Sequence, residues 1–194
     1  MESLAELLTE CERLHGHMCA GQLLGARMAL LGCRLIGIEE PRGKDRKNLI
    51  VWVEIDRCMA DAVSAVTGVR LGKRSLKYVD YGKVAATFLN TTTKAAVRIV
   101  ALESSRELAN ERYPEIDDKR QRQFFAYSEA AEAELFKIEA VSVELRDTDM
   151  PGSPRSRAIC SNCEEGINDG REVLRTDGRV LCRACHEGAY YVGN

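Results

Sequence analysis

Residues 49–55 read Leu49-Ile50-Val51-Trp52-Val53-Glu54-Ile55, and this stretch indicates how the sheet of the protein is buried. It is apolar at almost every position, whereas a strand with one solvated face alternates apolar and polar residues. We therefore expect a strand that is buried on both faces. The longest apolar run of the chain lies inside it, at residues 49–53, and is far shorter than the ~20 residues that cross a bilayer. The sequence thus predicts no membrane partner.

Helical patterns lie on both sides of this strand. Ser3 and Glu6 have the S-x-x-E spacing of a capping box, in which the hydroxyl accepts a free backbone N–H and the carboxylate reaches back. Apolar residues then recur every three or four positions, which is the spacing of an amphipathic helix. Gly16, Gly32 and Gly68 are expected to end the first three helices. The predicted helices cover residues 4–15, 20–31, 59–67, 102–112 and about 118–135.

Three more segments have strand patterns. Residues 83–90 and 95–100 flank a threonine-rich loop and predict a β-hairpin, and residues 137–145 alternate between apolar and polar side chains. Strands and helices do not alternate strictly along the chain. The predicted fold class is therefore α+β, with a mixed or antiparallel sheet and packed helices.

Length and composition limit the remaining possibilities. The chain has 194 residues, 45% hydrophobic and 30% charged, which fits one ordinary domain with a small appendage and excludes global disorder. Its formal net charge of -2 gives no general attraction to nucleic acid. The start, Met1-Glu2-Ser3, has no basic segment followed by an apolar one, so we expect no signal peptide and a cytoplasmic location. There, eight cysteines indicate metal sites or reactive thiols rather than disulfides.

The cysteines divide the chain into two parts. Four lie between positions 11 and 58 and four between 160 and 185. The segment before the second group contains two of the four prolines and alternating charges, which is the composition of an exposed connection. We therefore expect a larger metal-binding domain at residues 1–147, a linker at 148–157 and a small domain at 158–194.

The C-terminal cysteines have the spacing of a zinc ribbon. Two C-x2-C pairs are separated by 18 residues, and each pair can place two sulfurs on one side of a tight turn, so that four thiolates surround Zn²⁺. Because about 40 residues form too small a core, metal binding would supply the folding energy. Two metal-free redox pairs are the alternative, and His186 could replace its neighbour as a ligand. The predicted zinc ligands are Cys160, Cys163, Cys182 and Cys185.

The rest of the ribbon sequence indicates only weakly what function the ribbon has. Residues 171–176 and 179–182 flank Asp177-Gly178, a dipeptide that favours a type I′ hairpin. From residue 151 onward, six arginines are balanced by six acidic residues, whereas phosphate binding requires a basic surface. Tyr190 and Tyr191 could stack on bases, but packing or a protein contact suits such a pair better. We expect a structural or docking role and no nucleic-acid partner.

A second cluster of ligand-type side chains lies near the N-terminus, where residues 15–21 read His15-Gly16-His17-Met18-Cys19-Ala20-Gly21. Cys19 would begin a helix, where the macrodipole lowers a thiol pKa and favours the thiolate, and Cys58 has the same position after the buried strand. One imidazole and two thiolates, from His17, Cys19 and Cys58, would make a transition-metal site with a fourth position open.

Each of these residues also has a structural interpretation. A histidine near a helix end can be a cap, and a buried cysteine can act as a small apolar residue. For Cys11, on the apolar stripe of the first helix, and for Cys33, just after the second, the structural interpretation is the better one. His17, Cys19 and Cys58 are favoured as a site because they form a set.

The same motifs resemble the FmdE family of formylmethanofuran dehydrogenase proteins. His15-Gly16-His17-x-Cys19-x-Gly21-x3-Gly25 is similar to the opening of that family, and three further blocks follow in the same order. These blocks are Asp56-x-Cys58-x2-Asp61-Ala62, Thr67-Gly68-x3-Gly72-Lys73 and Asp80-x-Gly82-Lys83-x-Ala85. The C-terminal ribbon resembles the DksA/TraR-type C4 zinc finger.

The resemblance implies an α+β domain, usually a homodimer, whose metal is held by His17, Cys19 and Cys58 with His15 and Asp61 nearby. We therefore expect Zn²⁺ in the ribbon and a second transition metal in the N-terminal domain, for which zinc is the first candidate.

Three functions are open at this point. The first, implied by the resemblance, is an accessory or metal-handling partner of a molybdenum- or tungsten-dependent oxidoreductase. Lys73 and Lys83 are then candidates for the polar wall of a cleft, or simply solvated surface. The second is a metal-dependent enzyme whose open position activates water or binds substrate. The third is a regulator whose ribbon contacts RNA polymerase or nucleic acid, and the charge balance counts against it.

Overall fold

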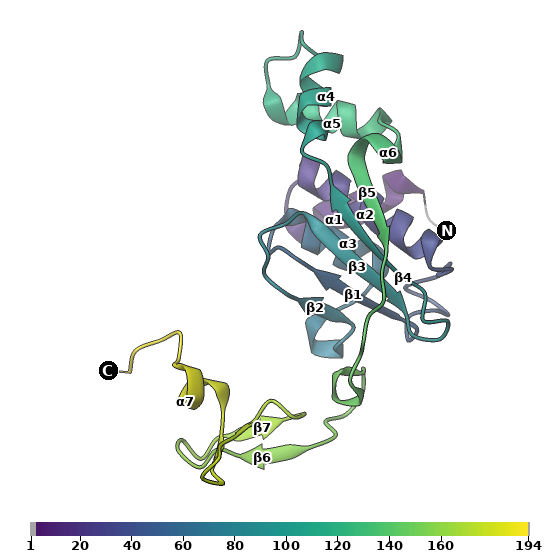
Figure 1. Ribbon diagram of the computed structural model, residues 1–194. Coiled ribbons are helices and arrows are strands. Elements are labelled where there is room, and N and C mark those ends of the chain that lie inside the picture. The colour runs from purple at the N-terminus through teal and green to yellow at the C-terminus, as the bar shows by residue number, and fades with distance from the viewer. Residues whose placement is uncertain (1–2, 194) are drawn as a thin grey trace. The chain divides into compact units, whose positions relative to one another are not determined.

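A five-stranded mixed sheet forms the framework of the N-terminal part of the molecule, with strand order β2-β1-β3-β4-β5 (Figure 1). The computed structural model describes residues 3–193. β1 pairs in parallel with β2, and all other neighbours are antiparallel. The strands are β1 (Leu49–Val53), β2 (Leu76–Tyr78), β3 (Ala85–Asn90), β4 (Ala96–Ala101) and β5 (Phe136–Ala140). The predicted α+β class with a mixed sheet is confirmed.

The stretch that begins at Leu49 forms the second strand of the sheet. Ile50 and Val51 are neighbours in β1 and so face opposite sides of the sheet. Both are fully buried, which confirms that the strand is buried on both faces. The strand ends at Val53, two residues before the predicted limit. The predicted hairpin is also present, as the antiparallel pair β3 and β4.

Three helices pack on one face of the sheet and lie behind it in Figure 1. The predicted capping box is present, since the Ser3 hydroxyl accepts from the Glu6 backbone N–H and the Glu6 carboxylate accepts from the Ser3 N–H. Gly16 and Gly68 follow the first and third helices with left-handed φ values of 90° and 72°, as expected for helix ends. The helices are α1 (Leu4–His15), α2 (Ala20–Leu35) and α3 (Cys58–Thr67).

The second helix is longer than predicted and runs through Gly32. A Cβ atom at this position would lie 2.4 Å from the ring of Phe88 on β3. The prediction that Gly32 ends the helix was wrong, because this glycine allows α2 to pack closely on the sheet. Cys33, expected just beyond the helix, is therefore inside it.

Three short helices connect β4 to β5: α4 (Ser104–Arg112), α5 (Lys119–Glu129) and α6 (Glu132–Leu135). The side chain of Asp118 caps α5 by accepting from the Gln121 backbone N–H. The single helix expected over residues 118–135 is broken at Ala130 and Ala131, which have extended ψ values of 144° and 153°. The Glu134 carboxylate accepts from the Ala131 N–H at 2.7 Å and so starts a separate helix.

The chain divides into two compact units, Met1–Glu144 and Leu145–Asn194. In the second unit, the turn η2 (Asp147–Asp149) is held by ion pairs of Asp149 with Arg146 and Arg171. Part of the segment predicted as a linker thus contacts this unit. Its elements are β6 (Arg157–Ile159), β7 (Gly166–Asn168), β8 (Val173–Leu174), β9 (Val180–Leu181) and α7 (Arg183–Glu187).

The hairpin predicted around Asp177-Gly178 is present as β8 and β9. A type I′ turn needs positive φ at both central residues. Gly178 has a φ of 83°, but Asp177 does not have a positive φ. The predicted turn type was therefore wrong. The Asp177 side chain accepts from the Arg179 backbone N–H, a local bond that aspartate makes in other turns. Among residues 3–193, no helix is long and apolar enough to cross a membrane.

Candidate metal centres

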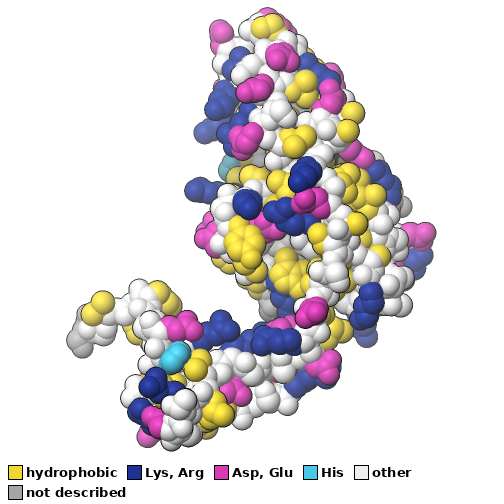
Figure 2. Space-filling model, viewed as in Figure 1, with side chains coloured by type: hydrophobic (Ala, Val, Ile, Leu, Met, Phe, Trp, Pro, Cys, Tyr) yellow, Lys and Arg dark blue, Asp and Glu magenta, His cyan; other side chains and the backbone are white. Residues whose placement is uncertain are grey.

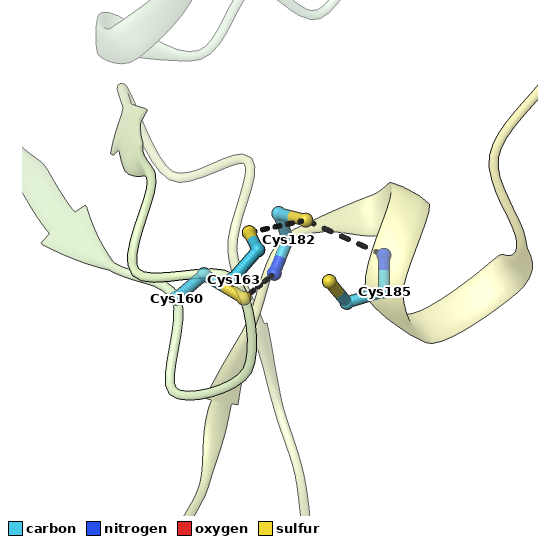
Figure 3. A group of neighbouring side chains, drawn as sticks. All are labelled: Cys160, Cys163, Cys182 and Cys185. Carbon is cyan, nitrogen blue, oxygen red and sulfur yellow. Dashed lines mark hydrogen bonds between the residues drawn. The ribbon is translucent and has the colours of Figure 1, made fainter. Parts of the chain in front are cut away.

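The four C-terminal cysteines point toward one another (Figure 3). Cys160 and Cys163 come from the turn between β6 and β7, whereas Cys182 and Cys185 lie at the start of α7. Their sulfurs all lie within 4.8 Å of one another, and those of Cys163 and Cys182 are 3.9 Å apart. Tetrahedral zinc with Zn–S bonds of ~2.3 Å separates its sulfurs by ~3.8 Å. The cluster therefore fits a zinc ion.

N–H groups donate to three of these sulfurs. The backbone N–H of Cys182 donates to Cys160 Sγ, and that of Cys185 donates to Cys182 Sγ, each at 3.3 Å. The Asn162 side-chain amide donates to Cys185 Sγ at 3.3 Å. Backbone N–H groups of Cys163 and Cys182 lower the pKa of Cys160 to about 6. This favours the thiolate at Cys160, whereas burial and the neighbouring thiols raise the pKa of Cys163 and Cys182.

The end of α1 and the start of α2 bring a second group of ligands together. Gly16 turns the chain sharply after His15, and Cys19 is the N-cap residue of α2. The ligand atoms of His15, His17 and Cys19 lie within 4.8 Å of one another. His17 is exposed, and the other two are half-buried, so a metal ion could reach the group from solvent. The prediction assigned His15 only a place nearby, whereas the structure places it inside the group.

Asp61 supports this arrangement from the first turn of α3. Its Oδ2 lies 2.8 Å from His15 Nδ1. A carboxylate accepts from an Nδ1–H group, which leaves Nε2 as the metal-binding atom of the ring. Protein metal sites use such a carboxylate to orient a histidine and to raise its basicity. Asp61 is thus placed to orient His15.

Cys58 begins α3 and lies beside Cys19, although the closely spaced group of three does not include it. A Cβ atom at Gly21 would lie 3.7 Å from Cys19 Sγ and 3.8 Å from Cys58 Sγ, so both sulfurs border the same glycine. Burial raises the pKa of Cys58 above its ordinary value, and the Cys19 thiol and the Asp61 carboxylate raise it further. The backbone N–H of Cys58 lowers the pKa by less, so the net direction is opposite to the lowered pKa expected at a helix start.

A cavity of about 630 Å³ opens beside this group. His15, Cys58 and Asp61 line one part of it. Its other walls include apolar side chains of β1 and β2 and the side chains of Arg57 and Arg70. The volume lies in the range of small-molecule sites. The predicted wall residues Lys73 and Lys83 are exposed and are not among the residues that line it.

Sequence reasoning missed β2, which supplies Leu76 and Tyr78 to the cavity wall. This strand has three residues, too few to show an alternating pattern. Cys11 and Cys33, assigned to the core, are both buried, and burial raises the pKa of their thiols to about 11 and about 12.

The donor atoms of the N-terminal group suit a transition metal. Two imidazoles and a thiolate are ligands for zinc, copper, nickel or iron. Their spacing agrees with metal–ligand bonds of about 2.0–2.3 Å. The orientation of His15 by Asp61 is a further feature of such sites. The residues present therefore fit a metal ion.

An α+β domain with this group, followed by a four-cysteine cluster, defines a metal-binding protein with a C-terminal zinc finger. Comparison with known families gives the same result. Residues 14–148 match the family described as FmdE, Molybdenum formylmethanofuran dehydrogenase operon, and residues 155–191 match the prokaryotic DksA/TraR C4-type zinc finger. The chain belongs to the FmdE family.

Two similar proteins extend this comparison. A protein of Archaeoglobus fulgidus, named "Probable S-adenosyl-L-methionine-binding protein", is 34% identical over 97 residues. The match covers 50% of this chain but only 26% of that protein. The crystal structure of a tungsten formylmethanofuran dehydrogenase FmdE-like protein from Syntrophus aciditrophicus matches with a TM-score of 0.63 and 22% identity, over 98% of this chain and 96% of that chain. The similarity to this crystal structure shows that the two proteins share a fold.

Proposed function

We propose that the N-terminal domain binds one transition metal ion, with zinc as the first candidate. His15, His17 and Cys19 would supply ligands. Cys58, whose sulfur borders the same glycine as that of Cys19, is a candidate for a second thiolate. The observation that carries this proposal is the 4.8 Å spacing of three ligand atoms, with His15 held by Asp61. With three protein ligands, a metal bound there would supply a positive charge and an open coordination position beside the cavity.

We propose further that the protein is an accessory or metal-handling partner of a molybdenum- or tungsten-dependent oxidoreductase. Membership of the FmdE family supports this role, because the description of that family names a molybdenum formylmethanofuran dehydrogenase operon. The exposure of His17 also supports it, since a site that passes metal on must be reached from outside.

The role can be tested in the organism that makes the protein. Deleting the gene should lower the metal occupancy of the molybdenum or tungsten enzyme in the same cells. The intact gene should restore that occupancy, and a His15→Ala/Cys19→Ala variant should not. His186→Ala, which alters the one histidine outside the N-terminal group, is the matched control and should restore occupancy fully. Unchanged occupancy in the deletion strain would contradict the role.

A metal-dependent enzyme is the second candidate, and the cavity of about 630 Å³ favours it. His15 and Cys58 border a space that can hold a small molecule next to the metal. A small molecule that occupies this space would protect Cys58 from alkylation in the metal-loaded protein. If the protein is a metal carrier without a substrate, a compound that leaves the metal in place should not protect Cys58 from alkylation.

A cytoplasmic homodimer remains part of the proposal, and light scattering after size-exclusion chromatography would test the dimer. For a regulator that binds nucleic acid, the surface gives little support. On the face that Figure 2 shows, Lys and Arg side chains are interspersed with Asp and Glu. Binding of the ribbon to DNA that weakens steeply with salt would revive that function.

A further inference from the structure

One buried amide links the helix that begins after Cys19 to the helix that begins at Cys58. Gln22 lies in the first turn of α2 and is fully buried. Its Nε2 donates to the main-chain carbonyl oxygen of Cys58 at 2.8 Å. We propose that Gln22 is a positioning residue of the N-terminal metal site, which fixes Cys58 beside Cys19. This inference rests on the proposed function, since it concerns the same metal site.

Glycines allow the two helices to approach but do not fix their alignment. A Cβ atom at Gly25 would lie 2.7 Å from both the Met59 carbonyl oxygen and Ala62 Cβ, so α2 and α3 are in backbone contact there. At Gly21, a Cβ atom would lie 3.2 Å from Cys58 Cβ. These van der Waals contacts allow close packing but include no hydrogen bond that ties one helix to the other. The hydrogen bond from Gln22 to the Cys58 carbonyl oxygen supplies that tie.

The other end of the same amide argues against a purely stabilising role. Gln22 Oε1 is buried, and it has no hydrogen-bond partner among the described residues. A buried acceptor without a partner costs stability, so an apolar side chain of the same shape would serve the core at least as well. We therefore explain the glutamine by its donor group, which holds the main chain of Cys58 and so positions the Cys58 thiol.

The test uses the full chain and Co²⁺ as the probe. Thiolate-to-cobalt charge transfer absorbs in proportion to the number of thiolate ligands. The spectrum of a Cys19→Ser/Cys58→Ser variant reports the ribbon alone and is subtracted. In Gln22→Met, which keeps the shape and loses the donor, the remaining absorption should fall to that of Cys58→Ser. Cobalt affinity at this site should fall about 10–100-fold, as for other residues that orient ligands.

Stability is measured on the same samples without metal. The melting temperature of Gln22→Met should equal or exceed that of the wild type, whereas a purely structural role predicts a lower value with an unchanged cobalt spectrum. If Gln22→Met does not fold, the shorter Gln22→Leu replaces it. Thr67→Val is the matched control, because Thr67 is a buried polar residue at the far end of α3 whose hydroxyl donates to the Val63 carbonyl.

Two negative results are distinct. If Gln22→Met keeps the absorption and affinity of the wild type, the positioning role is overturned and the metal site stands. If the wild type shows no absorption beyond that of the double cysteine variant, the proposed metal site itself fails.

Discussion

The hydrogen bond between His15 and Asp61 is the single contact that most distinguishes a metal site from a chance group of ligands. His15 is half-buried, whereas 63% of the Asp61 side chain is exposed. An exposed carboxylate contributes little to folding. Its value in this position is the orientation that it gives to the imidazole.

Asp61→Asn should therefore weaken metal binding without unfolding the domain. We expect a loss of about 10–100-fold in affinity at the N-terminal site, as found for other carboxylates that orient ligating histidines. Competition with a chromophoric chelator would measure it. Asp56→Asn is the matched control, since Asp56 lines the same cavity, and it should bind as the wild type does. Equal affinities in both variants would show that Asp61 does not orient a ligand.

Glu54 and Arg98 form a second residue-level feature, on the sheet. Two guanidinium nitrogens of Arg98 lie 2.6 and 2.7 Å from the Glu54 carboxylate, which is 5% exposed. Arg98→Met would leave this buried carboxylate unpaired. We expect the free energy of unfolding to fall by about 3 kcal/mol, the low end for a broken buried pair. Urea unfolding at pH 7 measures it. Arg13→Met, which removes an exposed pair with Glu10, should cost far less, and equal losses would contradict this.

At the scale of the elements, α2 is the helix on which both the core and the site depend. Gly32 packs against Phe88, and Gly25 packs against α3. A methyl group at Gly25 must push α3 away because backbone and Cβ atoms, not flexible side-chain ends, occupy the space. The same shift would separate Cys58 from Cys19.

Gly25→Ala should thus lower stability and metal affinity together. Overpacking of this kind costs about 1–3 kcal/mol, which thermal unfolding would detect. Gly72→Ala is the control, since no atom lies within 4 Å of a Cβ there. Wild-type stability of Gly25→Ala would show that the two helices are not in tight contact.

Periodicity predicted most of the elements, and each error has an identifiable physical cause. The capping box at Ser3 and the stop at Gly68 were visible because they depend on neighbouring residues. The role of Gly32 was not visible, because it depends on Phe88, which is distant in the sequence. The break at Ala130 depends on how Glu134 bonds to the backbone, which propensity does not encode.

At the scale of the whole molecule, the two units obtain their stability from different sources. The N-terminal unit has an extended apolar core between helices and sheet. The core of the ribbon consists of Cys160, Ile167 and Leu181 with a few half-buried neighbours. So small a core needs a metal.

Removal of metal by a strong chelator should therefore unfold the ribbon and leave the larger unit folded. We expect new proteolytic cuts confined to residues 145–193. The first unit should keep a cooperative melting transition, lowered only by the loss of its own bound metal. Added zinc should restore protection. Persistent resistance of the ribbon after complete metal removal would contradict a metal-dependent fold.

The sequence predicted more of the C-terminal site than of the N-terminal site. The spacing of Cys160, Cys163, Cys182 and Cys185 identified the ribbon directly, and the structure brings their sulfurs together. For the N-terminal group, the local sequence indicated His17 and Cys19. The placement of Asp61 behind His15 and the buried bond of Gln22 arise from the packing of α3 on α1 and α2, which no local pattern reports.

The most direct test of the central claim is the number of metal ions per chain. Mass spectrometry would compare the wild type with a Cys19→Ala/Cys58→Ala variant, both purified without chelators. We expect two ions per chain in the wild type and one in the variant, which keeps the ribbon ion. One ion per chain in both proteins, with no second ion bound after zinc is added back, would contradict a metal site in the N-terminal domain.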